Sequence, residues 1–276
     1  IEQEPEVRAH NFEEVSWGLD EERAFLESTR CLECKDPVCI PGCPVNVDIR
    51  SFVQLMMQKD YVGAVNKIRE TNYLPAICGR VCPQEMQCQG VCIQNKMPIA
   101  IGQLEWFLPE REKLRHPDGA AQRFAGIPDP WEVGAKPPIA IVGSGPSGLI
   151  NAYLLAAEGF PVTVFEAFHA LGGVLRYGIP EFRLPNDLID DVVSKIKMLG
   201  GKFVANFVVG KTATLEELRE AGFARIFVGT GAGLPRFMNV PGEHLLNVMS
   251  ANEFLTRVNL MQGLRADYET PLPDIE

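Results

Sequence analysis

All eight cysteines of this 276-residue chain lie in one stretch that begins at Cys31 and ends at Cys92. They form two runs, which read CLECKDPVCIPGCP over residues 31–44 and CGRVCPQEMQCQGVC over residues 78–92. Cysteines that only fill a hydrophobic core would be scattered among apolar neighbours. Those of this chain lie beside lysine, aspartate, glutamine, arginine and proline, which predicts loops that present thiols as metal ligands.

The spacing of the first run separates three kinds of thiol chemistry. A disulfide framework is typical of small secreted domains, and no signal peptide is visible, although a chain that begins with Ile1 suggests that its true start is missing. Zinc sites usually present two separated C-x2-C pairs, or cysteine with histidine. The pattern C-x2-C-x4-C-x3-C-P is instead close to that of two-cluster ferredoxins. The spacing therefore favours iron–sulfur clusters over zinc.

The composition limits the other functions that the chain could have. Its length is enough for two domains, and a hydrophobic content of 46% is typical of a globular protein. The formal net charge of −10 argues against a nucleic-acid partner, because phosphate binding needs a basic surface. No apolar run is long enough for a membrane span. We expect a cytoplasmic protein that binds neither nucleic acid nor membrane.

Helices are predicted around the cysteine loops, and they would hold those loops in place. Asp20, Asp48 and Asp60 each stand where a side chain could cap a helix. The expected helices cover residues 20–30, 48–59, 60–71 and 101–108, the last of which carries Glu105. Residues 1–19 are expected to form an extended arm. The prediction is an α-helical domain over residues 1–115, then a linker rich in Pro, Gly and Asp over 116–137.

A second domain, over residues 138–276, is predicted from a dinucleotide-binding fingerprint. A short apolar run, Ile139–Val142, precedes the motif GSGPSG at 143–148, and a helix and a second strand follow and end in Glu166. The first glycine forms the turn, the second lets the backbone approach a pyrophosphate, and the third lets the helix pack on the strand. A carboxylate at Glu166 can accept from ribose hydroxyls and would repel a 2′-phosphate, so NADP is disfavoured at this turn.

The remaining sequence favours FAD over NAD as the nucleotide. The doublet Gly172–Gly173 lets a loop lie against a large ligand, and a second glycine-rich loop over 229–233 follows a predicted strand. Between and beyond these loops we expect further elements, namely helices over 185–201, 214–222 and 250–262 and a strand over 202–209. The alternative for the second loop is a simple turn.

Several motifs occur in one order along the chain and together carry a family resemblance. They are RCLECKDPVCIPGCPV, ICGRVCPQEMQCQGVC, IAIGQLEWF, IAIVGSGPSG, LGGVLRYGIPEFRLP and VGTGAG. As a set they resemble the family that contains the small subunit of NADPH-dependent glutamate synthase. The same family includes the flavin subunit of NADH-dependent reduced ferredoxin:NADP oxidoreductase and the N-terminal part of dihydropyrimidine dehydrogenase.

The resemblance implies two 4Fe–4S clusters with crossed ligation. One cluster would be held by Cys31, Cys34, Cys39 and Cys92. The other would be held by Cys43, Cys82, Cys88 and Glu105, the last in a position where relatives carry Gln or Glu. Cys78 would then be a spare thiol, although its spacing to Cys82 alone would make it the ligand.

The resemblance also implies the FAD site and the fold, an α-helical double-cluster domain followed by a Rossmann-like FAD-binding domain that is incomplete at its C-terminus. The residues expected at FAD are Gly143, Ser144, Gly145, Pro146, Ser147, Gly148, Glu166, Ala167, Gly172, Gly173, Val174, Arg183, Val209, Gly229, Thr230 and Gly231. Relatives continue into a second nucleotide domain, so we expect the NAD(P)H site to lie outside this chain.

The function implied is that of an electron-transfer flavoprotein. NAD(P)H would reduce FAD, and single electrons would pass through the clusters to a larger partner subunit, either a glutamate synthase large subunit or a ferredoxin-linked flavoprotein. This chemistry needs no acid–base side chain, so we predict no catalytic residue. Two alternatives remain open: a cluster-bearing docking module whose flavin half-site needs further segments, and a zinc-binding scaffold on a nucleotide-binding fold.

Overall fold

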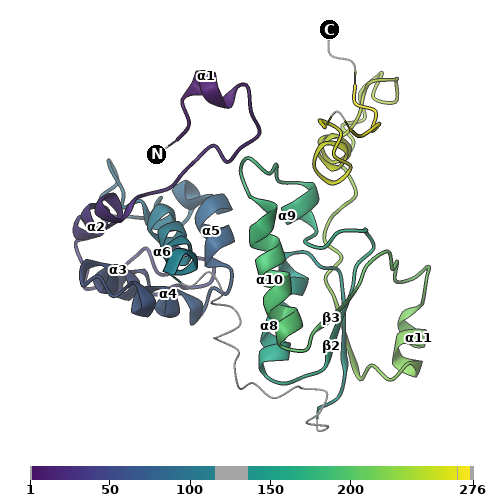
Figure 1. Ribbon diagram of the computed structural model, residues 1–276, viewed down its shortest axis with the longest axis horizontal. Coiled ribbons are helices and arrows are strands. Elements are labelled where there is room, and N and C mark those ends of the chain that lie inside the picture. Colours follow the sequence, from purple (N-terminus) through teal and green to yellow (C-terminus); the bar gives the residue numbers. More distant parts are fainter. Residues whose placement is uncertain (1, 116–135, 266, 274–276) are drawn as a thin grey trace. The chain divides into compact units, whose positions relative to one another are not determined.

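The computed structural model describes residues 2–115, 136–265 and 267–273. They group into two units, one built on helices α1 to α6 and the other on a parallel sheet with its own helices (Figure 1). This order of an α-helical unit and then an α/β unit confirms the predicted fold class. The predicted linker lies almost wholly outside the described residues. None of the described helices has both the length and the apolar character that crossing a membrane requires.

Helices connected by loops form the first unit. Their bounds are α1 Pro5–Arg8, α2 Glu21–Thr29, α3 Ile49–Met57, α4 Tyr61–Arg69, α5 Pro75–Val81, the 3₁₀ turn η1 Gln84–Met86, and α6 Ile101–Arg115. Each predicted aspartate cap is confirmed. Asp20 accepts from the Arg23 N–H, and Asp48 and Asp60 cap α3 and α4 in the same way. These side chains satisfy N–H groups that have no partner inside the helix.

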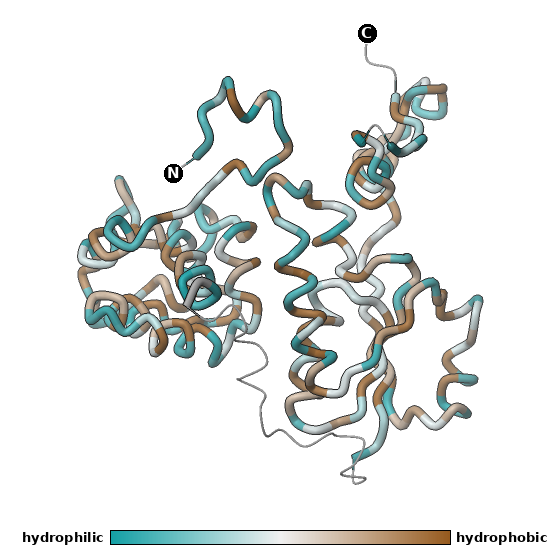
Figure 2. The backbone as a smooth tube through the Cα atoms, viewed as in Figure 1, coloured by the Kyte–Doolittle hydropathy of each residue, from teal (hydrophilic) through white to brown (hydrophobic). Residues whose placement is uncertain are grey.

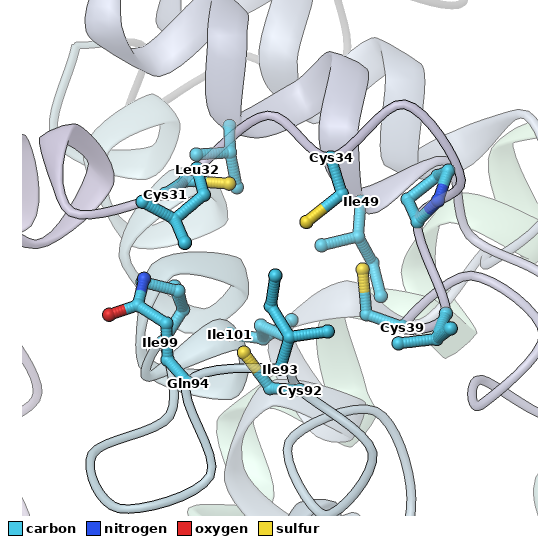
Figure 3. Close-up of a pocket in the computed structure, with 13 residues that line it drawn as sticks. Cys31, Leu32, Cys34, Cys39, Ile49, Cys92, Ile93, Gln94, Ile99 and Ile101 are labelled. Atoms are coloured by element: carbon cyan, nitrogen blue, oxygen red, sulfur yellow. The ribbon is translucent and has the colours of Figure 1, made fainter.

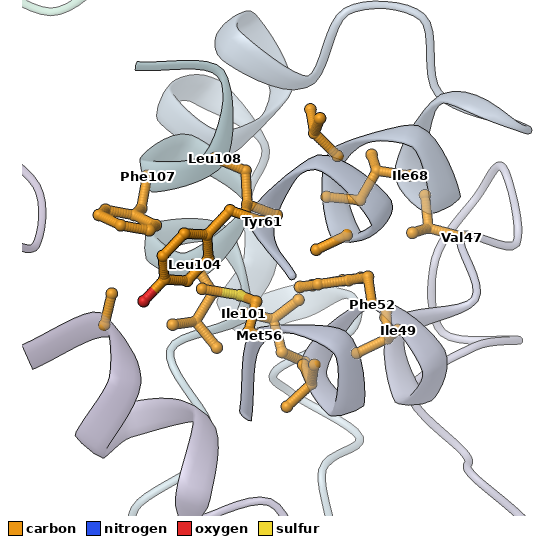
Figure 4. Close-up of a cluster of buried hydrophobic side chains, with 14 of the residues drawn as sticks. Val47, Ile49, Phe52, Met56, Tyr61, Ile68, Ile101, Leu104, Phe107 and Leu108 are labelled. Carbon is orange, nitrogen blue, oxygen red and sulfur yellow. The ribbon is translucent and has the colours of Figure 1, made fainter. Parts of the chain in front are cut away.

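An apolar cluster packs helices α2, α3, α4 and α6 of the first unit together (Figure 4). Phe52 and Met56 of α3 are fully buried with Leu104 of α6. The ring of Tyr61 meets that of Phe107 edge-on, with centroids 5.4 Å apart. Four of the cysteines, Cys31, Cys39, Cys43 and Cys92, pack against the side of this cluster. The core therefore lies directly beneath the cysteine loops and gives them a rigid support.

Two expectations for the first unit are wrong. Residues 1–19 are not a simple extended arm, because α1 lies within them and Glu2 and Ser16 form an isolated antiparallel bridge. The second cysteine run is not all loop, because Cys78 lies inside α5. Pro75 begins this helix, since a proline is well tolerated in the first turn.

The second unit is built on a four-stranded parallel sheet in the order β3-β2-β1-β4. The strands are β1 Ile139–Val142, β2 Val162–Phe165, β3 Lys202–Val204 and β4 Arg225–Val228. The helices are α8 Pro146–Ala157, α9 Val174–Tyr177, α10 Asn186–Met198, α11 Leu215–Glu220 and α12 Ala251–Leu255, which continues as the π-helix η2 Thr256–Leu260. This strand order is that of a dinucleotide-binding fold, whose ligand lies where β1 and β4 diverge.

Helices cover both faces of the sheet (Figure 1). On one side α8 contacts β1, β2 and α10. On the other, Leu218 of α11 packs against Ala140 and Phe165. Hydrophobic and hydrophilic residues alternate in bands along the helices of both units (Figure 2). The two central strands are buried on both faces, which is why their sequences are almost continuously apolar.

The strand predicted over 202–209 is too long. It ends at Val204, because Asn206 has a positive φ of 54° and takes the chain out of the extended conformation. The Phe207 N–H then donates to the Glu166 carbonyl instead of continuing the ladder. The helices predicted over 185–201, 214–222 and 250–262 are confirmed, the second with a complete capping box at Thr214.

Candidate cluster and nucleotide sites

Four cysteines from both runs surround one pocket at the edge of the first unit (Figure 3). They are Cys31, Cys34 and Cys39 from the first loop and Cys92 from the end of the second run. The sulfur atoms are turned toward the central space, and aliphatic side chains complete the wall, Ile49 and Ile101 among them. The structure thus brings together the four residues expected at the first cluster.

This pocket suits a cluster better than a single ion. All eight thiols are free in the described residues. Within that part of the chain, no three His, Cys, Asp or Glu side chains converge closely enough to hold one metal ion. In a 4Fe–4S cluster each thiolate binds a different iron atom, so the sulfurs must surround a space. Burial raises the pKa of the Cys31 thiol and raises that of Cys39 to about 11, so these ligands need a cation to ionise.

The other four expected ligands form a second group between α5, α6 and the loop that follows α5. The thiol of Cys88 lies close enough to Glu105, Cys43 and Cys82 to feel each of them electrostatically. Burial, with Glu105 next in effect, raises the pKa of Cys88 to about 12. Burial, and then Cys82, raises the pKa of Glu105 to about 8. A buried set of acids that repel one another is the donor set expected around a cationic iron core.

Glu105 and Cys78 compete for the place of fourth ligand, and both reach this group. Glu105 is only 9% exposed and lies on α6. Cys78, one turn before Cys82 on α5, forms a side-chain hydrogen bond with Cys82 that raises the pKa of Cys78, to which burial adds. The same contact lowers the pKa of Cys82. Proximity alone does not separate the two candidates.

Two polar side chains near this second group were not predicted from the sequence. Asn72 donates from Nδ2 to Oε1 of Glu105 at 2.6 Å. Arg80, whose side chain is 4% exposed, forms ion pairs with Glu14 and Glu110 and lies over the ring of Trp106. Neither carries a recognisable motif. The only sequence signal was the position of Arg80 between two cysteines.

Each of the three fingerprint positions requires glycine for a different structural reason. A side chain at Gly148 would overlap the carbonyl oxygen of Gly143, so this glycine lets α8 pack on β1. Gly143 has a φ of 100°, and a side chain there would overlap the carbonyl oxygen of Gly229. Gly145 differs, because its backbone suits any residue and a Cβ there would meet nothing within 4 Å. Close approach of a ligand is the remaining reason for glycine at 145.

Glu166 lies at the end of β2 and is held from two sides. Its Oε2 accepts from the Ser144 N–H at 2.9 Å and from the Ser144 hydroxyl at 2.5 Å. Its Oε1 accepts from the Phe168 N–H at 2.9 Å. The Gly172 N–H in turn donates to the Ser144 hydroxyl, which ties the Gly-Gly loop to the fingerprint turn. Ser144 therefore faces Glu166, and it would act on a nucleotide through that carboxylate.

The fingerprint turn and the Gly229 loop meet at the carboxyl ends of two neighbouring strands, β1 and β4. Gly143 follows β1 and Gly229 follows β4, and the Gly229 N–H donates to the Val142 carbonyl. A side chain at Gly173 would come within 2.6 Å of the Gly145 Cα atom. The structure thus brings the Gly172–Gly173 loop and the Gly229 loop to the fingerprint turn, at the edge where this fold binds nucleotides.

The other residues expected at FAD are more scattered. Arg183 is exposed in the loop before α10, and Val209 packs against the Phe165 and Leu218 cluster. Ser147 and Val174 are exposed in the first turns of α8 and α9, and Ala167, Thr230 and Gly231 are exposed on loops. Pro146 begins α8. The residues present fit FAD at the core of the site, since an uncrowded Gly145, a fixed carboxylate and two close loops lie at one sheet edge.

Comparison with known families matches each unit separately. Residues 8–116 match the family described as dihydropyrimidine dehydrogenase domain II, 4Fe-4S cluster. Residues 141–186 match the NAD(P)-binding Rossmann-like domain. The first match covers both cysteine runs and Glu105, and the second begins within β1 and covers the fingerprint turn and Glu166.

Relatives of known name match most of the chain. NAD-dependent dihydropyrimidine dehydrogenase subunit PreT of Escherichia coli K12 is 36% identical over 247 residues, which cover 87% of this chain and 56% of the relative. The NADPH glutamate synthase small chain of Azospirillum brasilense is 31% identical over 261 residues, 91% of this chain and 51% of the relative. The chain therefore spans about half the length of these relatives.

Among solved structures, Mycobacterium tuberculosis FprA in complex with NADPH is 28% identical, with a TM-score of 0.41, over 45% of this chain and 29% of that one. The two family matches and the named relatives agree on one group of proteins. The chain is a homologue of the glutamate synthase small chains and of the PreT subunits of NAD-dependent dihydropyrimidine dehydrogenase, and its first unit matches the 4Fe-4S family described as dihydropyrimidine dehydrogenase domain II.

Proposed function

We propose that this chain is the cluster-bearing and FAD-binding part of an NAD(P)H-dependent oxidoreductase. It relays electrons between FAD and two 4Fe–4S clusters and delivers them to a larger partner subunit, as in a glutamate synthase. The NAD(P)H that supplies the electrons binds outside the residues described here, in the second nucleotide domain that the family resemblance implies. Bound FAD would accept a hydride from NAD(P)H and release electrons singly, which matches it to one-electron clusters.

The observation that carries this proposal is the meeting of Cys31, Cys34 and Cys39 with Cys92 around one pocket. Cys92 comes from the far end of the second run, so this convergence depends on the fold of the whole first unit. It leaves the second group, with Cys43 from the first run, as a separate set of donors. Crossed use of two cysteine runs is the arrangement of two-cluster ferredoxins.

In this proposal the chain's own residues position and insulate the cofactors. The thiols and Glu105 hold the clusters, while the aliphatic wall of the first pocket, with Ile49 and Ile101, keeps water from the sulfurs and so tunes the potential. The Gly145 backbone and the N-terminus of α8 receive a pyrophosphate. The Glu166 carboxylate, fixed by Ser144, accepts from ribose hydroxyls.

Anaerobic purification tests the proposal directly. The protein should be brown, with about eight iron and eight acid-labile sulfide per chain from two four-iron clusters. It should release FAD on denaturation. Cys92→Ser should halve the iron content, whereas the matched variant Cys78→Ser should keep it. Stoichiometric zinc without sulfide would contradict the cluster assignment. Full iron content with no flavin would instead indicate a cluster-bearing docking module.

A further inference from the structure

Asn72 is a buried amide that lies between the two candidate ligands of the second group. It follows α4, is 7% exposed, and its backbone N–H donates to the Ile68 carbonyl at 2.9 Å. Its side chain contacts Glu105 on α6 and Cys78 on α5. A single amide therefore contacts both side chains that could complete the second cluster.

The orientation of this amide is determined by its surroundings. The Leu74 backbone N–H, which can only donate, lies 3.0 Å from Asn72 Oδ1. The thiol of Cys78 donates to the same oxygen at 3.5 Å. Nδ2 must then be the atom that faces Glu105, and it donates to Oε1 at 2.6 Å. The oxygen end of the amide thus holds a thiol and the nitrogen end holds a carboxylate.

This arrangement affects the two candidate ligands in opposite ways. Oε1 of Glu105 is fixed by the Asn72 amide, which leaves Oε2 as the oxygen that would bind iron. Asn72 Oδ1 lies 3.5 Å from Cys78 Sγ and so engages the Cys78 side chain from the side of α4. Thiolate is the softer donor and would otherwise be preferred by iron over a carboxylate.

We propose that Asn72 is a positioning residue that presents Glu105 to the second cluster and keeps Cys78 from replacing it. This inference rests on the proposed function, since it requires a cluster at Cys43, Cys82 and Cys88. It adds that Asn72, which is not itself a ligand, determines whether Glu105 or Cys78 binds the cluster. Without Asn72, Cys78 would replace Glu105 as a ligand: an Fe–S bond would form, the Fe–O bond to Glu105 would break, and the thiol proton would pass to the released carboxylate.

Two substitutions separate this role from simple packing. Asn72→Ala removes both ends of the amide. Asn72→Asp keeps an acceptor for the Leu74 N–H and for Cys78 but, once ionised, cannot donate to Glu105. Asn66→Ala is the matched control, because Asn66 is an exposed asparagine on α4 of the same unit.

The readout is the second cluster itself, in anaerobic full-chain protein, by electron paramagnetic resonance of the reduced state and by redox titration. Both Asn72 variants should keep their full iron content and show a changed spectrum and a shifted midpoint potential for one cluster only. Adding Cys78→Ser to either variant should abolish that shift, or remove the second cluster while the first remains. Asn66→Ala should match the parent protein.

Wild-type spectra and potentials in both Asn72 variants would overturn the inference, as would a shift that persists when Cys78 is also removed. Loss of the cluster in Asn72→Ala but a wild-type spectrum in Asn72→Asp would also overturn it, because it shows a packing role. Failure of the proposed function looks different. In that case the parent protein would contain no iron or sulfide, whereas a Glu105→Ala variant with both clusters unchanged would overturn the inference.

Discussion

Ser144 donates twice to one oxygen of Glu166, from its backbone N–H at 2.9 Å and from its hydroxyl at 2.5 Å. Both residues are buried: Ser144 is fully buried, and Glu166 is 5% exposed. A carboxylate held by two donors on one oxygen cannot rotate freely, so its remaining acceptor capacity points in a fixed direction. The first glycine turn and the end of β2 are therefore coupled before any nucleotide binds.

Ser144→Ala tests this coupling. The variant loses a buried hydrogen bond to a charged group, and the free energy of unfolding should fall by about 1.5–3 kcal/mol. The FAD content of the purified protein should fall with it, because the ribose acceptor is no longer fixed. Chemical denaturation and flavin release measure the two effects. Ser194→Ala, at an exposed position on α10, is the control and should change neither; equal stability of the two variants would show that the hydroxyl is dispensable.

Gly145 and Gly148 should respond differently to the same substitution. Gly145→Ala places a methyl group where no protein atom lies within 4 Å, so the free energy of unfolding should stay within about 0.5 kcal/mol of the parent value. FAD affinity should fall by about tenfold or more, because the methyl group stands where the pyrophosphate approaches. Gly148→Ala should destabilise the fold by about 3 kcal/mol, since the methyl group overlaps the Gly143 carbonyl.

Isothermal titration with FAD and chemical denaturation distinguish these two kinds of glycine. If Gly145→Ala bound FAD as tightly as the parent protein, the pyrophosphate would have to lie elsewhere. If Gly148→Ala were as stable as the parent, the contact between α8 and β1 would have to relax without strain.

Glu105 and Cys78 are compared by removing each in turn. Glu105→Ala should perturb or lose one cluster and leave the all-thiolate cluster intact, which gives about half the iron content. Cys78→Ser should leave both clusters assembled. Glu105→Cys should restore four-point ligation with a shifted reduction potential, because ligand identity sets the potential. Iron analysis and redox titration check these results, and the reverse pattern would make Cys78 the ligand.

Arg80 joins the N-terminal residues to α5 and α6. Arg80→Met should lower the free energy of unfolding by about 2 kcal/mol, less than for a wholly buried ion pair because Glu14 and Glu110 remain partly exposed. The residues before Glu14 should become more sensitive to limited proteolysis. Arg23→Met removes an exposed ion pair on α2 and should have little effect on either measurement. Unchanged proteolysis in Arg80→Met would mean that other contacts hold this segment.

Local patterns in the sequence were enough to predict the parts of the fold that depend on near neighbours. Aspartate caps, the fingerprint turn and the helix over 185–201 all follow from residues a few positions apart. The presence of Cys92 and Cys31 at one pocket was expected only from the family resemblance. Spacing along the chain cannot show which loops fold onto the same pocket. The end of β3 was missed because the left-handed backbone at Asn206 is a single-residue event inside an apolar run.

Asn72 and Ser144 mark the limit of sequence reasoning at the sites. Ser144 was expected at FAD as part of a motif, but its hydroxyl faces Glu166. Asn72 lies in an ordinary polar turn, and only the packing of α4, α5 and α6 brings its amide to Glu105 and Cys78. Such residues act through contacts between distant segments, and these contacts cannot be predicted from the spacing of neighbouring residues.

The pairing of Cys31 with Cys92 around one pocket also orders the assembly of the protein in time. During synthesis the first site stays open until Cys92 has left the ribosome, by which point α2 to α5 have already been made. Before α6 has been made, the apolar cluster beneath the loops is incomplete, because Leu104 and Phe107 belong to α6. A cluster inserted after that stage closes a long loop, and a covalent link of such length restricts the unfolded chain by about 4 kcal/mol. Insertion of a cluster would then stabilise the newly made first unit against unfolding.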